Sequence, residues 1–198
     1  MKKKLMFYFD MMSPFSYLAH VKLPDMVKKY GYELQYHPMD IPRAKKAAGN
    51  YGPSNLEIPP KIKALKTDLM RWADRYAVPL NFPKNLKVQP WNVGALYAKK
   101  KGQLKEYVDE GYRRIWGEGC DPTEQSELEG LASTLGWNTD EFIQYINSPD
   151  AIKNFEQSCT EAENNGVFGA PIMMLDEQVW WGNDRLMFIE EYLQQKTT

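Results

Sequence analysis

The chain has 198 residues, 43% of them apolar and 13% aromatic, so it is long and apolar enough to fold around a sizeable core. Lysine and arginine (25) nearly balance aspartate and glutamate (26), and the net charge of −1 gives no electrostatic footprint for nucleic acid or an anionic membrane. No apolar run approaches the roughly 18 residues of a spanning helix. The apolar run over residues 5–9 is also shorter than the about 7–15 apolar residues of a signal peptide. We therefore expect a cytoplasmic protein that binds neither nucleic acid nor a membrane.

The start of the chain predicts a strand, a helix and a second strand. Residues 5–9 form a short apolar run that is typical of a buried strand. Ser13 suits an N-cap and Pro14 suits the first helical position, and the helix that they open should end near Gly31. Residues 32–36 alternate in polarity and predict the second strand. Because the crossover is short, the three elements should form a right-handed parallel β-α-β unit.

Strand signals disappear between residues 41 and 166, where helices are expected instead. The predicted helices cover residues 56–76, residues 92–116, a segment from Pro122 to Gly136, one capped by Asn138 or Thr139, and one capped by Ser148 and Pro149. Nothing repeats at a fixed period, so this segment does not indicate a solenoid.

The strand pattern returns after Gly166. Residues 171–175 and 178–181 flank a short polar turn and predict an antiparallel hairpin, which leads through Asn183 and Asp184 into a last helix. We therefore predict an α/β protein with a thioredoxin-like four-stranded mixed sheet and a large all-helical insertion. The thioredoxin-like domain would comprise residues 1–40 plus 166–198, and the insertion residues 41–165.

Cysteine and histidine usage limits the chemistry that the chain can perform by itself. Cys120 and Cys159 lie far apart and form no C-x-x-C pair, which argues against a disulfide framework. His20 and His37 lack the spacing of two metal ligands on one helix face, so we expect no metal. An enzyme with this sequence would take its reactive group from outside the chain.

Several short motifs carry a resemblance to a known family. The segment Ser13-Pro14-Phe15-Ser16 falls where thioredoxins carry C-x-x-C, and Ala170-Pro171 falls where that fold has its cis-proline. The further motifs are Phe9-Asp10, Tyr17-Leu18-Ala19, Lys46-Ala47-Ala48-Gly49-Asn50, Gly166-Val167-Phe168-Gly169 and Trp181-Gly182-Asn183-Asp184-Arg185. In this order, over nearly the whole chain, they resemble the 2-hydroxychromene-2-carboxylate isomerases, relatives of the kappa-class glutathione transferases within the DsbA-like thioredoxin group.

The resemblance implies a glutathione-dependent cis–trans isomerase of an aromatic keto acid, acting by transient thiolate addition. Ser13 would hydrogen-bond the thiol of glutathione as the catalytic residue, and Lys46 would bind the carboxylate of a small aromatic substrate. The glutathione-binding residues implied are Ser13, Asn50, Ala170, Pro171, Asn183 and Asp184. The same resemblance implies a cis Ala170–Pro171 bond and a homodimer.

Each of these residues also has a purely structural interpretation. Ser13 could only cap its helix, a role worth about 1 kcal/mol, and Asn183 or Asp184 could do the same. Pro171 could simply start an edge strand, and Asn50 could simply stabilise the turn in which it lies. Lys46 could be one of several solvent-exposed lysines without a function. Three other functions also stay open: a kappa-like glutathione S-transferase, a non-enzymatic thioredoxin-like protein that binds glutathione or a peptide, and, last, a thiol oxidoreductase that uses one of the cysteines.

Overall fold

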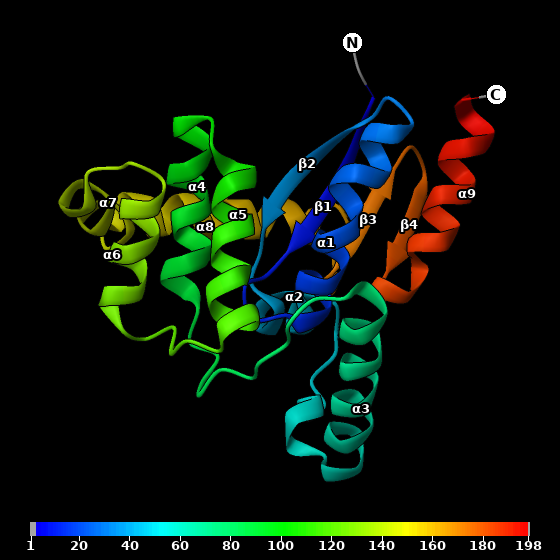
Figure 1. The fold of residues 1–198 in the computed structure, drawn as a ribbon, viewed down its shortest axis with the longest axis horizontal. Helices are drawn as coiled ribbons and strands as arrows, with labels where there is room; N and C mark the ends of the chain where they lie inside the picture. The colour runs from blue at the N-terminus through cyan, green and yellow to red at the C-terminus, as the bar shows by residue number, and fades with distance from the viewer. Residues whose placement is uncertain (1–2, 198) are drawn as a thin grey trace.

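Four strands form one mixed sheet in the computed structural model, which describes residues 3–197 of the chain (Figure 1). The strands are β1 (Lys4–Phe9), β2 (Glu33–Pro38), β3 (Ile172–Leu175) and β4 (Gln178–Trp181). Their order is β2-β1-β3-β4, with β1 parallel to β2 and the other two pairs antiparallel. The predicted β-α-β unit, the C-terminal hairpin and the four-stranded mixed sheet are therefore confirmed.

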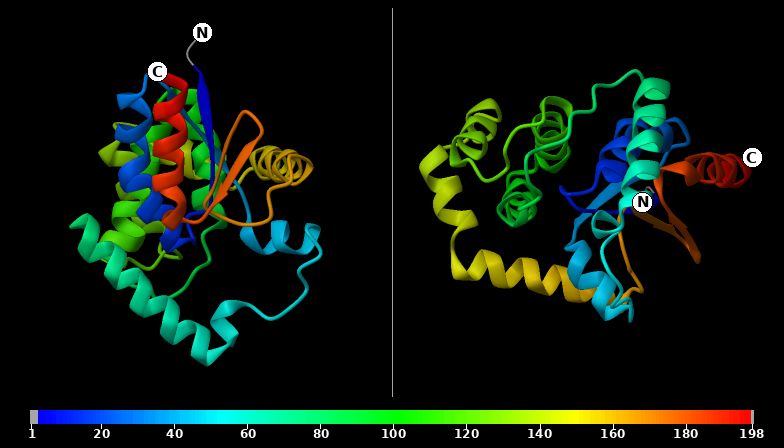
Figure 2. Two further views of the ribbon diagram at one scale, coloured as in Figure 1. Left: turned by 90° about the vertical axis from the view of Figure 1, so that its right-hand side faces the viewer. Right: turned by 90° about the horizontal axis from the view of Figure 1, so that it is seen from below.

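Helices cover both faces of this sheet, as Figure 2 shows. Helices α1 (Pro14–Lys29) and α9 (Leu186–Thr197) lie on one face, and α8 (Pro149–Asn164) lies on the other. Leu5, Phe7 and Met173 are fully buried on the α1 side, whereas Tyr8 and Ile172 belong to a second apolar cluster on the α8 side. The alternation of side chains along each strand thus places one apolar set against each helical layer.

The helical segment is divided more finely than the sequence suggested. Its elements are α2 (Ile41–Ala47), η1 (Asn55–Glu57), α3 (Pro59–Tyr76), α4 (Gln89–Lys101), α5 (Leu104–Tyr112), the π-helical turn η2 (Arg113–Glu118), α6 (Gln125–Thr134) and α7 (Thr139–Ile146). The single helix predicted over residues 92–116 is wrong, because Gly102 adopts a left-handed conformation with φ of 72° and ends α4. Pro122 does not open α6 but lies in a turn before it, and α2 was not predicted at all.

Two predicted helix starts are confirmed by their caps. The Asn138 side chain accepts a hydrogen bond from the backbone N–H of Glu141, and the Ser148 side chain accepts one from that of Ala151. Both bonds satisfy N–H groups that the first turn of a helix leaves free. Local sequence therefore sets where α7 and α8 begin.

One apolar cluster runs without a break from the sheet into the helical block, by which we mean α4–α7 and η2. It includes Phe7 and Ile189 on the sheet side and Trp91, Tyr107 and Leu131 in the block. Helix α3 extends beyond the sheet, at the end opposite the chain termini (Figure 1). Among the helices of residues 3–197, none is long and apolar enough to cross a membrane.

Candidate active site

Ser13 lies in the turn between β1 and the start of α1, where only 5% of its surface is exposed. Its hydroxyl oxygen accepts a hydrogen bond from the backbone N–H of Ser16 at 3.1 Å and caps the helix. The same hydroxyl donates to the carbonyl oxygen of Ala170 at 3.3 Å. Ser13 therefore combines the structural role of an N-cap with a second contact to the far end of the chain.

Ala170 and Pro171 lie opposite this turn, immediately before β3. The peptide bond between them is cis, as the resemblance implied. The Pro171 carbonyl accepts a hydrogen bond from the backbone N–H of Gly182 at 3.0 Å, which holds the start of η3 (Asn183–Arg185) beside it. The structure thus brings together three of the predicted segments: the Ser13 turn, the cis-proline and the turn before α9.

Asn183 and Asp184 occupy η3, a short 3-10 turn that precedes α9. Asn183 is 1% exposed, and its Oδ1 accepts a hydrogen bond from the Tyr76 hydroxyl of α3 at 3.1 Å. Its Nδ2 is buried without a hydrogen-bond partner among the described residues. Asp184 is about half exposed and forms an ion pair with Arg185, so its carboxylate is not free in this structure.

Lys46 and Asn50 lie on α2 and in the turn after it, and both are exposed. Figure 1 shows α2 beside the start of α1, at the carboxyl ends of β1 and β2. Neither side chain takes part in a hydrogen bond or ion pair with another residue that the structure describes. The structure therefore places them at the same end of the sheet as Ser13 without joining them to it.

Asp10, from the Phe9-Asp10 motif, is a buried carboxylate beneath the Ser13 turn to which the sequence assigned no role. It is 1% exposed and accepts hydrogen bonds from Asn92 Nδ2 at 2.7 Å, from the backbone N–H of Ile41 at 2.9 Å and from that of Met12 at 3.1 Å. Burial raises the pKa of this carboxyl to about 6, although the three hydrogen bonds act in the opposite direction. Its one sequence signal is an acidic residue directly after a buried strand, and its partner Asn92 lies 82 residues away.

The cysteines give no support to thiol chemistry. Cys159 is buried in α8 and Cys120 is half-buried after η2, and both are free thiols. Burial raises the pKa of each thiol to about 12, so both are protonated near neutral pH. Among the described residues, no group of three or more metal-binding side chains could hold a metal ion.

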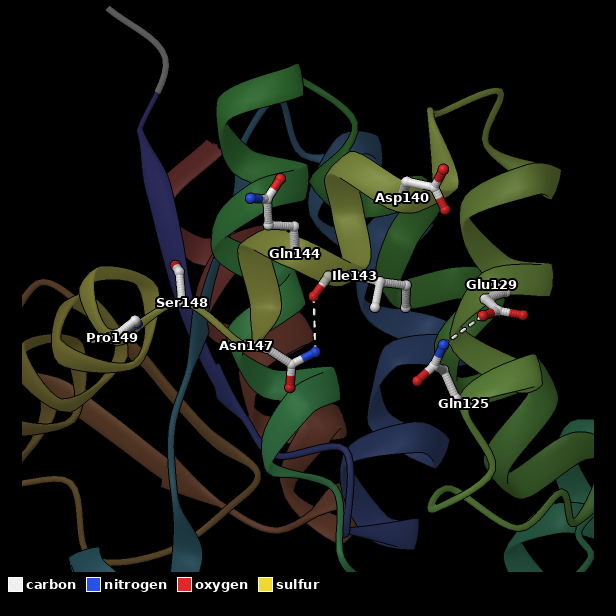
Figure 3. Close-up of a pocket in the computed structure, with 8 residues that line it drawn as sticks. All are labelled: Gln125, Glu129, Asp140, Ile143, Gln144, Asn147, Ser148 and Pro149. Carbon is white, nitrogen blue, oxygen red and sulfur yellow. Dashed lines mark hydrogen bonds between the residues drawn. The ribbon is translucent and has the colours of Figure 1, made fainter.

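A hollow of about 550 Å³ lies on the helical block rather than at the Ser13 turn (Figure 3). It opens between α6, α7 and the start of α8, and its wall includes Glu129, Asp140, Asn147 and Ser148. No predicted site residue lines it. The candidate site is therefore defined by the contacts around Ser13 and not by this hollow.

Comparisons with known proteins bear on the fold and the family of the chain. The family model of the DSBA-like thioredoxin domain matches residues 4–194. A protein of Sphingobium xenophagum named 2-hydroxychromene-2-carboxylate isomerase is 50% identical over 193 residues, which cover 98% of this chain and 99% of the relative. The human protein named Glutathione S-transferase kappa 1 is 24% identical over 205 residues, covering 96% of this chain and 90% of that protein. A solved structure of 2-hydroxychromene-2-carboxylate isomerase superposes with a TM-score of 0.93 at 38% identity, covering 97% of this chain and 95% of that one.

Proposed function

Because the chain belongs to the DsbA-like thioredoxin family and, within it, to the 2-hydroxychromene-2-carboxylate isomerases, we propose that it is a glutathione-dependent cis–trans isomerase. Its substrate would be 2-hydroxychromene-2-carboxylate or a similar aromatic keto acid, interconverted with the trans-o-hydroxybenzylidenepyruvate form. The observation that carries the proposal is the Ser13 hydroxyl, held at the N-terminus of α1 and 3.3 Å from the Ala170 carbonyl. A serine at this place offers a hydrogen bond to a sulfur atom and no redox chemistry of its own.

The residues around Ser13 fit glutathione. The N-terminus of α1 favours an anion, and the Ser13 hydroxyl can donate to one. Asn183 Nδ2 is a buried donor that still lacks an acceptor among the described residues, which a carboxylate or carbonyl oxygen of the tripeptide can supply. Because this nitrogen is covered, the ligand must displace the groups around it to reach it. When bound, glutathione supplies a thiolate that converts the substrate's double bond into a single bond for as long as it is attached.

Ser13 would raise the fraction of thiolate. A free thiol with a pKa near 8.5 is only about 3% ionised at pH 7. The dipole of α1 and one hydroxyl hydrogen bond both favour the anion, and each pKa unit gained corresponds to about 1.4 kcal/mol. The Ser13 proton now points to the Ala170 carbonyl at 3.3 Å, a long hydrogen bond, so rotation about Cβ–Oγ can redirect it to sulfur at little cost.

Lys46 would supply the cation for the substrate carboxylate. It is exposed on α2, and the first N–H of this helix is bonded to the Asp10 carboxylate beneath the Ser13 turn. The charge is therefore carried by an element that is fixed relative to Ser13, while the side chain itself is free to reach a ligand. A carboxylate held in this way would orient the planar substrate toward the thiol.

A glutathione S-transferase of the kappa type is the second candidate, supported by the 24% identity to the human protein of that name. The same Ser13 and thiol would serve both reactions. The two differ in the fate of the glutathione: an isomerase releases it unchanged, whereas a transferase consumes it in a stable conjugate.

An absorbance assay of the purified protein with 2-hydroxychromene-2-carboxylate, with and without glutathione, tests the proposal. We expect rapid conversion to the trans isomer only when glutathione is present, with no loss of free thiol. Conjugate accumulation would favour the transferase. Glutathione binding without turnover of either kind would leave a non-enzymatic binding protein, and the absence of binding would reject glutathione as the cofactor.

A further inference from the structure

The backbone of the turn that precedes the α1 N-cap is held by side chains of the helical block. The Met11 N–H donates to Asn92 Oδ1 at 3.0 Å, and the Met11 carbonyl accepts from Trp116 Nε1 at 2.8 Å. The Asp10 carbonyl accepts from the Tyr112 hydroxyl at 3.1 Å. These three partners come from α4, α5 and η2, between 81 and 105 residues along the chain from the groups they bind. Three distant elements thus converge on two consecutive residues.

The Met11 side chain inserts into the same block. It is fully buried, and its methyl group lies so close to α5 that a Cβ atom at Gly111 would be 2.9 Å from it. Real Cβ atoms essentially never come this close, so a side chain at position 111 would force the flexible end of Met11 to shift. The block therefore contacts the turn through packing as well as through hydrogen bonds.

Trp116 reaches Met11 from an unusual piece of helix. It lies in η2, where the α-helical pattern of α5 gives way to a π-helical turn over Arg113–Glu118. Such turns are rare and occur frequently at functional sites. Because a π-turn has more residues than an α-turn, it changes the direction in which the following side chains point. Here the Trp116 ring is 2% exposed and its N–H is directed to the turn.

We propose that Tyr112 and Trp116 are positioning residues for the reaction, because they fix the turn from which Ser13 presents its hydroxyl to the glutathione thiol. This inference rests on the proposed function. Hydrogen bonds are directional, so they fix the orientation of the turn more strictly than apolar packing does. A displacement of about 1 Å in a reacting group can cost on the order of 100-fold in rate. A small displacement of the turn that carries Ser13 should therefore be visible as a lower kcat.

The chain offers a closely matched pair of variants to test this. Tyr112 and Tyr107 both lie on α5, both are fully buried, and both donate a hydroxyl hydrogen bond to a backbone carbonyl. Tyr112 donates to Asp10 in the turn, whereas Tyr107 donates to Trp91 within the helical block. Tyr112→Phe and Tyr107→Phe therefore remove the same kind of bond from the same helix, with and without contact to the turn.

We expect Tyr112→Phe to lower kcat by about tenfold and to shift the titration of the bound glutathione thiol, followed by the ultraviolet absorbance of the thiolate, to higher pH. Tyr107→Phe should lose a similar amount of thermal stability while keeping the kcat and the thiol titration of the unaltered protein. Trp116→Phe should change both quantities in the same direction as Tyr112→Phe.

Three results separate this inference from the proposed function. Wild-type kcat and thiol titration in Tyr112→Phe, or equal losses in Tyr107→Phe, would overturn the positioning role alone. An unaltered protein that binds glutathione but turns over no substrate would reject the proposed reaction, while the thiol titration of the two variants would still decide the positioning role. An unaltered protein that does not bind glutathione would overturn both.

Discussion

Ser13 caps α1, and we propose a second task for the same hydroxyl group, as the donor to the glutathione thiol. Ser148 performs only the first, at the start of α8, and there too its hydroxyl both accepts from the first turn and donates to a backbone carbonyl. The two serines are therefore matched in local structure. They differ in the cis-proline that lies opposite Ser13.

Substitution of each serine by alanine separates the two tasks. Ser13→Ala and Ser148→Ala should each lower the free energy of unfolding by about 1 kcal/mol, the usual cost of a lost N-cap. Only Ser13→Ala should also lower kcat, by about tenfold at pH 7, because a thiol pKa higher by about one unit lowers the fraction of thiolate about tenfold. Thermal unfolding and the isomerase assay measure the two effects. Equal activity in both variants would mean that Ser13 is a cap and nothing more.

Asp10 gives the stability of the fold a specific dependence on pH. Burial raises its pKa from 3.8 to about 6, so the folded chain holds this proton more tightly than the unfolded chain does. The stabilisation is fully present below about pH 4 and is lost as the pH rises through 6, a total on the order of 3 kcal/mol. The sign is opposite to that of a carboxylate stabilised by an ion pair.

Asp10→Asn tests this prediction, because asparagine does not titrate. We expect the unfolding free energy of the unaltered protein, relative to Asp10→Asn, to fall steadily between about pH 4 and pH 7 in urea denaturation experiments. All other titrating groups are common to both proteins and cancel in the difference. A difference that stays constant over this range would contradict the raised pKa.

For individual residues, the sequence predicted those that short motifs mark. It missed the contacts that the fold makes between distant residues. Ser13 was marked by a helix-start signature together with the family resemblance, and Pro171 by the resemblance alone. The pairing of Asp10 with Asn92 was missed, although Asp10 lies in the Phe9-Asp10 motif, because the hydrogen bond joins residues 82 positions apart. A buried polar pair of this kind becomes visible only when the packing is known.

Among the elements, α3 and α4 each end at a single residue with left-handed backbone conformation. Gly102 ends α4 with φ of 72°, and no atom lies within 4 Å of the place that a Cβ atom would take there. Ala77 ends α3 in the same conformation, with φ of 55°. This conformation costs a residue with a Cβ atom about 1–2 kcal/mol and costs glycine almost nothing.

Substitutions at these two positions should therefore have opposite effects on the stability of the protein. Gly102→Ala should destabilise the protein by about 1 kcal/mol, and Ala77→Gly should stabilise it by a similar amount. Thermal or urea unfolding of both variants would check this. Changes of the same sign in both would show that contacts outside the backbone decide the effect.

The sequence predicted one long helix over residues 92–116 because its pattern does not reveal the break at Gly102. Apolar side chains continue at helical spacing on both sides of the glycine, so periodicity alone does not detect the interruption. A single glycine within such a pattern is compatible with a helix that continues and with one that ends. Here the tertiary packing of α4 against α5 favours the ending.

In the whole molecule, the apolar core joins the sheet to the helical block. Leu131 of α6 and Ile189 of α9 are both fully buried in the same cluster, although they belong to opposite ends of the molecule. The block also holds the Ser13 turn by hydrogen bonds from Asn92, Tyr112 and Trp116. Neither part completes its core or its turn without the other, so the two should unfold together.

Two core substitutions test this cooperativity. Leu131→Ala and Ile189→Ala each remove a fully buried aliphatic side chain and should cost about 2–5 kcal/mol. If the molecule unfolds as one unit, each variant shifts the whole urea transition to lower concentration, with far-UV circular dichroism and tryptophan fluorescence still coincident. The denaturant slope should stay unchanged in both. If the block were independent, Leu131→Ala would instead divide the transition in two, with the block unfolding first, while Ile189→Ala would leave the unfolding of the block unshifted. Loss of the block would then release the turn, so catalytic activity should disappear with the early transition of Leu131→Ala and not with the later one.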